Sequence, residues 1–179
     1  GSSYTFGVNG GPGGAGGPAF GGGLHNSQGR ASLTNCTVAA SAAVGGAAGK
    51  GGAVGDSRTG TGTVGLRGKS GESAGGGLHN DANGGSVTLA NCIIVKSPSG
   101  GNGSGPITDS GHNLSSDASM NFTASGSRNN IDPKLGASAL RGGFTETLPL
   151  LVGSPAIDGG NPAACLTTLW GAWLECPGP

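Results

Sequence analysis

Charged and aromatic side chains are scarce in this chain. Only 10% of its 179 residues are charged and 4% are aromatic, and nine basic residues balance nine acidic ones. A chain without net charge lacks the basic surface that nucleic acid or an anionic membrane attracts, so we expect neither as a partner. No apolar run approaches the roughly 20 residues that cross a bilayer, so we expect no transmembrane segment.

Large apolar side chains are also scarce, because glycine accounts for 42 residues. Glycine-rich tracts are often disordered, but here the apolar residues recur at regular positions. We therefore expect a thin core of Leu, Val, Ile, Ala and Cys between closely spaced backbones. The sequence shows no cofactor motif, and we expect no cofactor.

A repeated unit organises the chain. The sequence Gly-Gly-Gly-Leu-His-Asn occurs at residues 21–26 and again at 75–80, an offset of 54 residues. Residues 32–38 are similar to residues 88–94, at an offset of 56 residues. Tandem units that cannot bury their apolar face alone must stack on one another.

The repeat predicts an all-β fold, a short parallel β-helix of about four rungs. Alternation places the leucines inward, and the asparagines fall at turns, where they can hydrogen-bond from rung to rung. The predicted stacks are Leu24 with Leu78, Leu33 with Leu89, Asn35 with Asn91, and Asn26 with Asn80 and Asn113.

Three further parts complete the predicted organisation. Residues 1–20 are a glycine-rich lead-in suited to extended, polyproline-like or coil conformations. The rungs occupy residues 20–128, with a glycine-rich insertion at about 45–74 that either packs as extended strands on the body or stays mobile. Residues 129–179 carry larger apolar residues and prolines, as a last rung and terminal cap segment should.

The repeat resembles a known family, the secreted right-handed parallel β-helix proteins of the choice-of-anchor Q domain and polymorphic outer-membrane protein type. Residues 21–26 are similar to that family's Gly-Gly-Gly-Ile-Tyr-Asn, and residues 34–38 to its Thr-Asn-Ser-Thr-Val. Residues 107–117, 132–136 and 153–162 match its late segments. The resemblance implies a right-handed coil and an extracellular or cell-surface setting, and it implies no established activity.

Three histidines, His25, His79 and His112, are each followed by Asn. In register they would form one outward stripe, about 4.8 Å apart per rung. Such a stripe is either a zinc or copper site, since imidazole suits both metals, or a stack of planar rings. No carboxylate or thiol repeats beside it, so we favour the stack of rings over the metal site.

Four cysteines are present. Cys165 and Cys176 bracket ten residues of the terminal segment, and we expect a disulfide between them. Cys36 and Cys92 occupy equivalent repeat positions. We expect small apolar members of an inner stack there, with a disulfide as the less favoured alternative.

Catalysis by a β-helix of the polysaccharide-cleaving kind needs acidic residues clustered on neighbouring rungs. The nine acidic residues do not recur at equivalent positions, and the closest pair on rungs, Asp109 and Asp117, flanks turns. We therefore expect no catalytic residues. A pectate-lyase-like protein that binds or cleaves polysaccharide is the alternative.

The sequence thus predicts a non-catalytic extracellular structural or adhesive protein. An uncovered first rung would expose unpaired backbone groups, which template the addition of another chain. The expected partner is the protein itself, stacked head to tail into a filament, with a surface polysaccharide as a second candidate.

Overall fold

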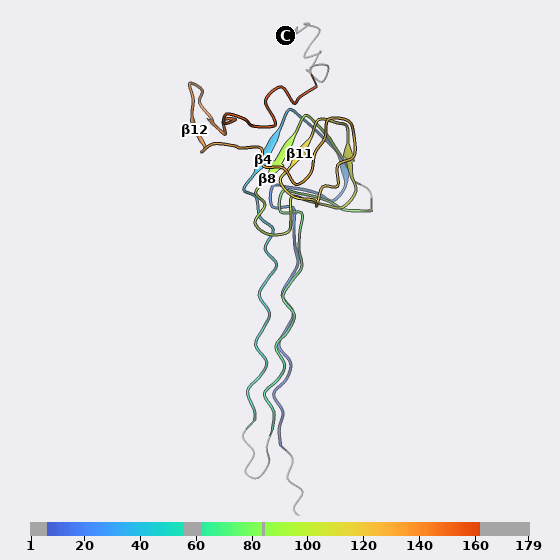
Figure 1. Cartoon of the computed structure of the whole chain (residues 1–179). Helices are drawn as coiled ribbons and strands as arrows, with labels where there is room; N and C mark the ends of the chain where they lie inside the picture. Colours follow the sequence, from blue (N-terminus) through green and yellow to red (C-terminus); the bar gives the residue numbers. More distant parts are fainter. Residues whose placement is uncertain (1–6, 56–61, 84, 162–179) are drawn as a thin grey trace, which may run out of the picture.

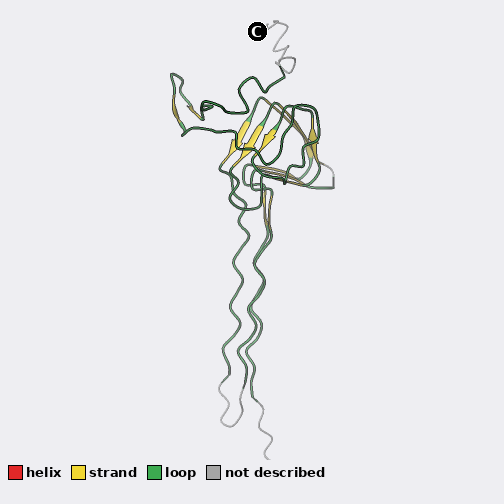
Figure 2. Ribbon diagram, in the orientation of Figure 1, coloured by secondary structure: helices red, strands yellow, loops and turns green. Residues whose placement is uncertain are grey.

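A computed structural model describes residues 7–55, 62–83 and 85–161 of the chain. Within these ranges the protein is all-β, with strands and loops but no helix (Figure 2). It has two parts: a head, residues 19–44, 73–83 and 85–161, and a long narrow stalk, residues 7–18, 45–55 and 62–72 (Figure 1).

The head is a stack of three rungs, each made of three short strands. Equivalent strands of successive rungs pair in parallel, which gives three parallel sheets, β2-β6-β9, β3-β7-β10 and β4-β8-β11. The first rung holds β2 (Leu24–Asn26), β3 (Gly29–Thr34) and β4 (Thr37–Ala39). The second holds β6 (Leu78–Asn80), β7 (Gly85–Ala90) and β8 (Ile93–Val95), and the third holds β9 (Gly103–Ser104), β10 (Ile107–Asp109) and β11 (Leu114–Ser115).

The register of the first two rungs confirms the repeat. Leu24 lies beside Leu78, and Leu33 lies beside Leu89. The amide of Asn26 donates to Oδ1 of Asn80 at 2.9 Å, and the amide of Asn91 donates to Oδ1 of Asn35 at 3.0 Å. Polar turn side chains therefore bond from rung to rung, as the sequence predicts.

The corner between the second and third strands of a rung requires a left-handed residue. Asn35 and Asn91 hold this position with φ of 56° and 53°. Asparagine tolerates this conformation better than most residues, because its short side chain can hydrogen-bond locally. The corner turns the chain sharply while the ladder of backbone hydrogen bonds continues on both sides.

The core lies inside the second rung. Leu78, Leu89, Cys92 and Ile94 are completely buried there. Met120 and Phe122, from the segment after β11, complete this cluster and close the third-rung end of the coil. At the other end, each of the three sheets stops at a first-rung strand, β2, β3 or β4, among the residues that the structure describes.

The described part of the last segment differs from a further regular rung. Arg128 forms an isolated parallel bridge to Leu114, and the N–H of Ile131 donates to Ser115 O at 3.0 Å, but no regular strand follows the third rung among the described residues of the stack. The chain then makes an antiparallel hairpin, β12 (Ala139–Leu140) with β13 (Glu146–Thr147), which projects beside β4 (Figure 1). Regular strands therefore make three rungs in the described ranges, where the sequence predicts about four.

The stalk contains three extended segments with glycine at every third residue. Residues 7–18 and 62–72 run parallel to each other, and residues 45–55 run antiparallel to both. A glycine N–H of each segment donates to a carbonyl of another, with N–O distances of 2.8 Å for Gly13 to Leu66, 2.9 Å for Gly49 to Gly14 and 3.0 Å for Gly68 to Gly49. Bonds between segments at a period of three residues are typical of packed polyproline II chains.

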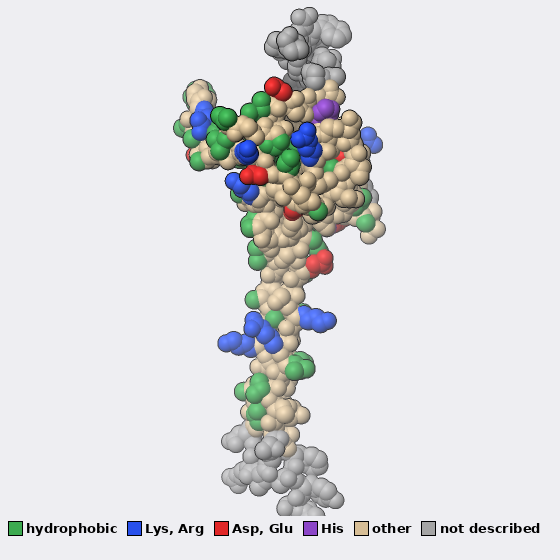
Figure 3. Space-filling model, in the orientation of Figure 1, with side chains coloured by type: hydrophobic (Ala, Val, Ile, Leu, Met, Phe, Trp, Pro, Cys, Tyr) green, Lys and Arg blue, Asp and Glu red, His purple; other side chains and the backbone are tan. Residues whose placement is uncertain are grey.

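Glycine fills most of the interior of the stalk, and Ala48 is the buried side chain among its described residues. A Cβ on Gly13 would lie 2.1 Å from the carbonyl oxygen of Gly49, and one on Gly68 would lie 2.0 Å from that of Gly14. Most of the other positions are exposed, and Lys and Arg side chains project from the surface of the stalk (Figure 3). The lead-in and the insertion therefore pack against each other, and strands β1 (Ala19–Phe20) and β5 (Ser73–Ala74) join the stalk to the head.

Candidate functional site

Two histidines and an aspartate meet on one face of the head. Nε2 of His79 lies 2.9 Å from Oδ1 of Asp81, and Nε2 of His25 lies 3.3 Å from the same oxygen. The side chains of His25 and Asp81 are 40% and 39% exposed, whereas that of His79 is 12% exposed. The cluster is therefore open to solvent on one side and backed by the head on the other.

The β-sheet register places these three residues. His25 on β2 pairs with His79 on β6, and both point outward because the leucines before them point into the core. Asp81 follows β6 directly, and its backbone N–H donates to the carbonyl of Asn26 at 2.9 Å. This bond anchors Asp81 to the first rung, so its carboxylate reaches both imidazoles.

Phe20 forms the wall of the cluster. Its ring stacks on that of His79 with 4.6 Å between centroids and 20° between planes, and it meets His25 edge to face at 6.3 Å. Phe20 ends β1, where the stalk meets the head, so the cluster lies at the junction of the two parts. Its ring helps to hold the His79 imidazole in one orientation.

The histidines favour the ionised form of Asp81. The hydrogen bond to His25 is the largest influence and lowers the pKa of Asp81, and the bond to His79 acts in the same direction. Partial burial opposes both and raises the pKa, and the net result lies below the ordinary value of 3.8. Nδ1 of His79 is buried and has no hydrogen-bond partner among the described residues.

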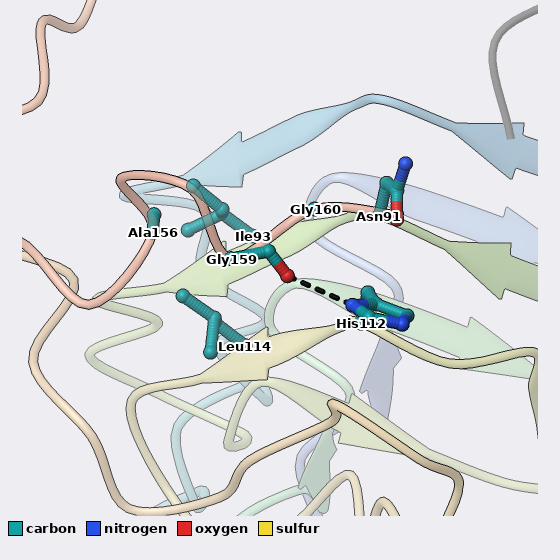
Figure 4. Close-up of a pocket in the computed structure, with 7 residues that line it drawn as sticks. All are labelled: Asn91, Ile93, His112, Leu114, Ala156, Gly159 and Gly160. Atoms are coloured by element: carbon teal, nitrogen blue, oxygen red, sulfur yellow. Dashed lines mark hydrogen bonds between the residues drawn. The ribbon is translucent and has the colours of Figure 1, made fainter. Parts of the chain in front are cut away.

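The third predicted member of the stripe, His112, is elsewhere. The residue in register with His79 on the third rung is Ser104, which corrects the predicted alignment. His112 instead occupies the left-handed corner equivalent to Asn91, with φ of 56°. Its Nδ1 lies 2.9 Å from the carbonyl oxygen of Gly159, at the edge of a small pocket between the strands and residues 156–160 (Figure 4).

Asn113 also departs from its predicted stack with Asn26 and Asn80. The pairing of Leu114 with Ile93 makes Asn113 the equivalent of Cys92, one position beyond the corner. It is fully buried, where its Oδ1 accepts from the N–H of Cys92 at 2.8 Å and its amide donates to Leu89 O at 2.9 Å. The third rung has its own corner lengths, and the motif Gly-His-Asn therefore falls at a different place in the coil.

Cys36 and Cys92 lie in equivalent positions, and both are free thiols, Cys36 half-buried and Cys92 buried. Burial raises the pKa of the Cys92 thiol. Its Sγ lies 3.2 Å from Ala90 O, to which the thiol donates. Cys165 and Cys176 lie outside the described residues.

The two acidic residues considered for catalysis are both engaged in turns. The Asp109 carboxylate accepts from the N–H groups of Thr123 and Ala124 at 2.8 and 2.7 Å. The Asp117 carboxylate accepts from the N–H of Asn102 at 2.9 Å and from the hydroxyl of Ser119 at 2.6 Å. Both hold the loop between residues 116 and 131 over the third rung.

Asp81 and Phe20 are the members of the site that the sequence analysis missed. Asp81 follows the second copy of Gly-Leu-His-Asn, where the first copy has Ser27. A search for carboxylates that repeat overlooks one that occurs in a single copy and serves both histidines. Phe20 immediately precedes the first copy and is one of only four phenylalanines.

Comparisons of the chain with protein-family models, with curated proteins and with solved structures gave no match. Among the described residues, no helix has the length and apolar character to span a membrane. Two imidazoles and a carboxylate within reach of one point can bind a metal ion or share protons.

Proposed function

We propose that this protein is a non-catalytic extracellular structural or adhesive protein whose stalk holds the head at a distance. The stalk is the observation that carries the proposal. At about 3.1 Å per residue, residues 7–18 extend for about 35 Å, and their glycines pack closely against the backbone of the other two segments. Such a construction suits a spacer, because its described residues pack backbone against backbone along its length.

The head suits the same role. We propose that its coil is right-handed, as parallel strand connections almost always are, and that residues 116–131 form an incomplete fourth turn. The bridge between Arg128 and Leu114 supports the fourth turn. The resemblance to secreted β-helix proteins supports an extracellular or cell-surface setting.

Self-association through the first rung is the partner interaction that the head supports best. Inward side chains of that rung, among them Leu24, Leu33 and Val38, are only partly buried, whereas their second-rung counterparts are fully buried. Edge strands of a parallel ladder leave alternate N–H and C=O groups unpaired. The first rung of another copy of the chain offers the same groups, so two copies can pair edge to edge about a two-fold axis.

Head-to-tail growth would also require an uncovered rung at the opposite end. Met120 and Phe122 occupy that end, and a Cβ on Gly103 would lie 2.0 Å from Sδ of Met120. We therefore propose a dimer through the first rungs in place of a filament. A polysaccharide remains the alternative partner, and cleavage of one is disfavoured because Asp109 and Asp117 are engaged in turns.

Sedimentation velocity tests the dimer. Ser32 is exposed at the centre of β3. The N–H of Asn35 donates to Ala90 O, so in this strand the N–H groups of odd-numbered residues point toward the second rung. By that alternation the N–H of Ser32 faces away, so Ser32→Pro removes a donor that only a partner would use. We expect a dimer for the natural chain and for Ser32→Ala, and a monomer for Ser32→Pro.

A natural chain that stays monomeric at every concentration tested would overturn the dimer, as would a Ser32→Pro variant that still dimerises. Incubation with pectin-like polymers tests the non-catalytic assignment separately. Release of unsaturated or reducing sugars would contradict it.

A further inference from the structure

We propose that His25, His79 and Asp81 bind a divalent transition-metal ion of the zinc class. The inference is independent of the structural role proposed above, since neither the stalk nor the first-rung interface requires a metal. It rests on the distances between the three side chains, on how rigidly they are held and on their exposure.

The distances fit a single ion. Zinc binds imidazole nitrogen and carboxylate oxygen at about 2.0–2.2 Å, so two ligand atoms on one ion lie about 2.8–3.6 Å apart for coordination angles between 90° and 110°. The two Nε2 atoms lie 3.3 and 2.9 Å from Oδ1 of Asp81, and the ligand atoms of all three residues lie within 4.8 Å of one another. A small rotation of the exposed His25 ring can close the remaining gap.

The ligands are held in place by the fold. The paired strands β2 and β6 fix the backbones of His25 and His79, and the N–H of Asp81 bonds to Asn26 O. The Phe20 ring packs on His79 and restricts its rotation. A site that is already arranged loses little conformational entropy when the ion binds.

The ligand set points to the zinc class. Imidazole binds zinc, copper and nickel well, whereas calcium and magnesium take oxygen ligands. Three protein ligands with exposed His25 and Asp81 leave at least one coordination position open to solvent. The ion would link the first rung to the second, because His25 lies on one and His79 and Asp81 on the other.

Titration with Co²⁺ provides the test, since cobalt occupies zinc sites and gives visible absorption bands that report its coordination. The full chain is first treated with a chelator and a reductant. We expect one Co²⁺ per chain, visible bands without a sulfur-to-cobalt charge-transfer band in the near ultraviolet, and displacement by Zn²⁺. Zn²⁺ should also raise the melting temperature.

Variants locate the ion. His79→Gln and Asp81→Asn should each weaken binding by at least the roughly 10–100-fold that loss of an outer-shell partner causes. His25→Gln, on an exposed side chain, should fold normally and yet lose the Zn²⁺-dependent rise in melting temperature. His112→Gln is the matched control, because that ring bonds to Gly159 O outside the cluster, and it should bind like the natural chain.

Three results would overturn the proposal. One is the absence of 1:1 binding at micromolar Co²⁺. Another is a charge-transfer band that places the ion on a thiol. The third is binding that survives in His25→Gln but disappears in His112→Gln.

Discussion

At the scale of single residues, equivalent positions have different exposure. Cys36 and Cys92 are equivalent in the repeat, but Cys36 belongs to the outer rung and is half-buried, whereas Cys92 is completely buried. Stacking of one rung on another therefore gives equivalent side chains different access to solvent.

Thiol labelling measures this difference. Burial raises the pKa of Cys92 and shields it, so the reactive thiolate is scarce. We expect iodoacetamide to modify Cys36 well before Cys92 in the folded chain, followed by mass spectrometry of peptides. Equal rates for the two thiols in the folded protein would contradict the position of Cys92 in the core.

Asp109 links pH to stability. Burial raises its pKa, but hydrogen bonds from Ala124 N–H, the Ser127 hydroxyl, the Asn113 amide and Gly111 N–H outweigh this, so the pKa lies below 3.8. A carboxylate with a lowered folded-state pKa stabilises the fold above its unfolded pKa of about 3.9, and that contribution is lost as the pH falls through the folded value.

The substitution Asp109→Asn should remove this contribution. We expect a loss of about 1–2 kcal/mol in the free energy of unfolding at neutral pH. The loss is moderate because the side chain is half-buried and the substituted amide still has one oxygen that accepts hydrogen bonds. Urea denaturation at several pH values measures it, and the difference from the natural chain should shrink below pH 4. A difference that stays constant down to pH 2 would show that charge is not the cause.

At the scale of elements, the stalk depends on which glycines face inward. Gly13 and Gly14 are adjacent, yet a Cβ would lie 2.1 Å from Gly49 O at the first and would meet nothing within 4 Å at the second. In residues 7–18 the packing thus requires glycine at one position in three, Gly10, Gly13 and Gly16, and leaves space for a side chain at Gly11, Gly14 and Gly17.

The pair Gly13→Ala and Gly14→Ala tests the stalk. We expect Gly13→Ala to force the segments apart and speed hydrogen exchange at the glycine amides that bond between them. Gly14→Ala should leave exchange unchanged or slow it, with a gain of up to about 0.4–1 kcal/mol from reduced freedom of the unfolded chain. Equal effects of the two substitutions would be incompatible with this packing.

The rungs also differ in what they contribute. Leu89 is completely buried in the second rung, and Leu33, its neighbour in register, is only partly buried. We expect Leu89→Ala to cost about 2–5 kcal/mol and Leu33→Ala clearly less, both measured by urea denaturation. A larger loss for Leu33→Ala would mean that the first rung is covered.

The sequence predicted the features that alternate or repeat over a few residues. Alternation located the stacked leucines, and the repeated Asn marked the corners. It did not predict the place of His112 or Asn113, because the third rung has different corner lengths and no exact copy of the motif. It also missed the pairing of the lead-in with the insertion, although glycine at every third residue in residues 7–16, 46–55 and 62–71 carried that signal.

At the scale of the whole molecule, the composition and the shape have one explanation. Glycine is abundant because the closely packed segments of the stalk leave little space for side chains, and large apolar side chains are few because the coil has a thin core. The result is a head on a stalk, in which no described strand pairs beyond the first rung and Met120 and Phe122 close the third-rung end. The central claim is that two such heads meet through their first rungs.

Small-angle X-ray scattering over a range of concentrations tests this claim most directly, because it reports mass and shape together. We expect the natural chain to reach twice the monomer mass with two stalks extending from a central body, while Ser32→Pro scatters as one head on one stalk. Identical curves for the two proteins at every concentration, with the mass of a monomer, would contradict it.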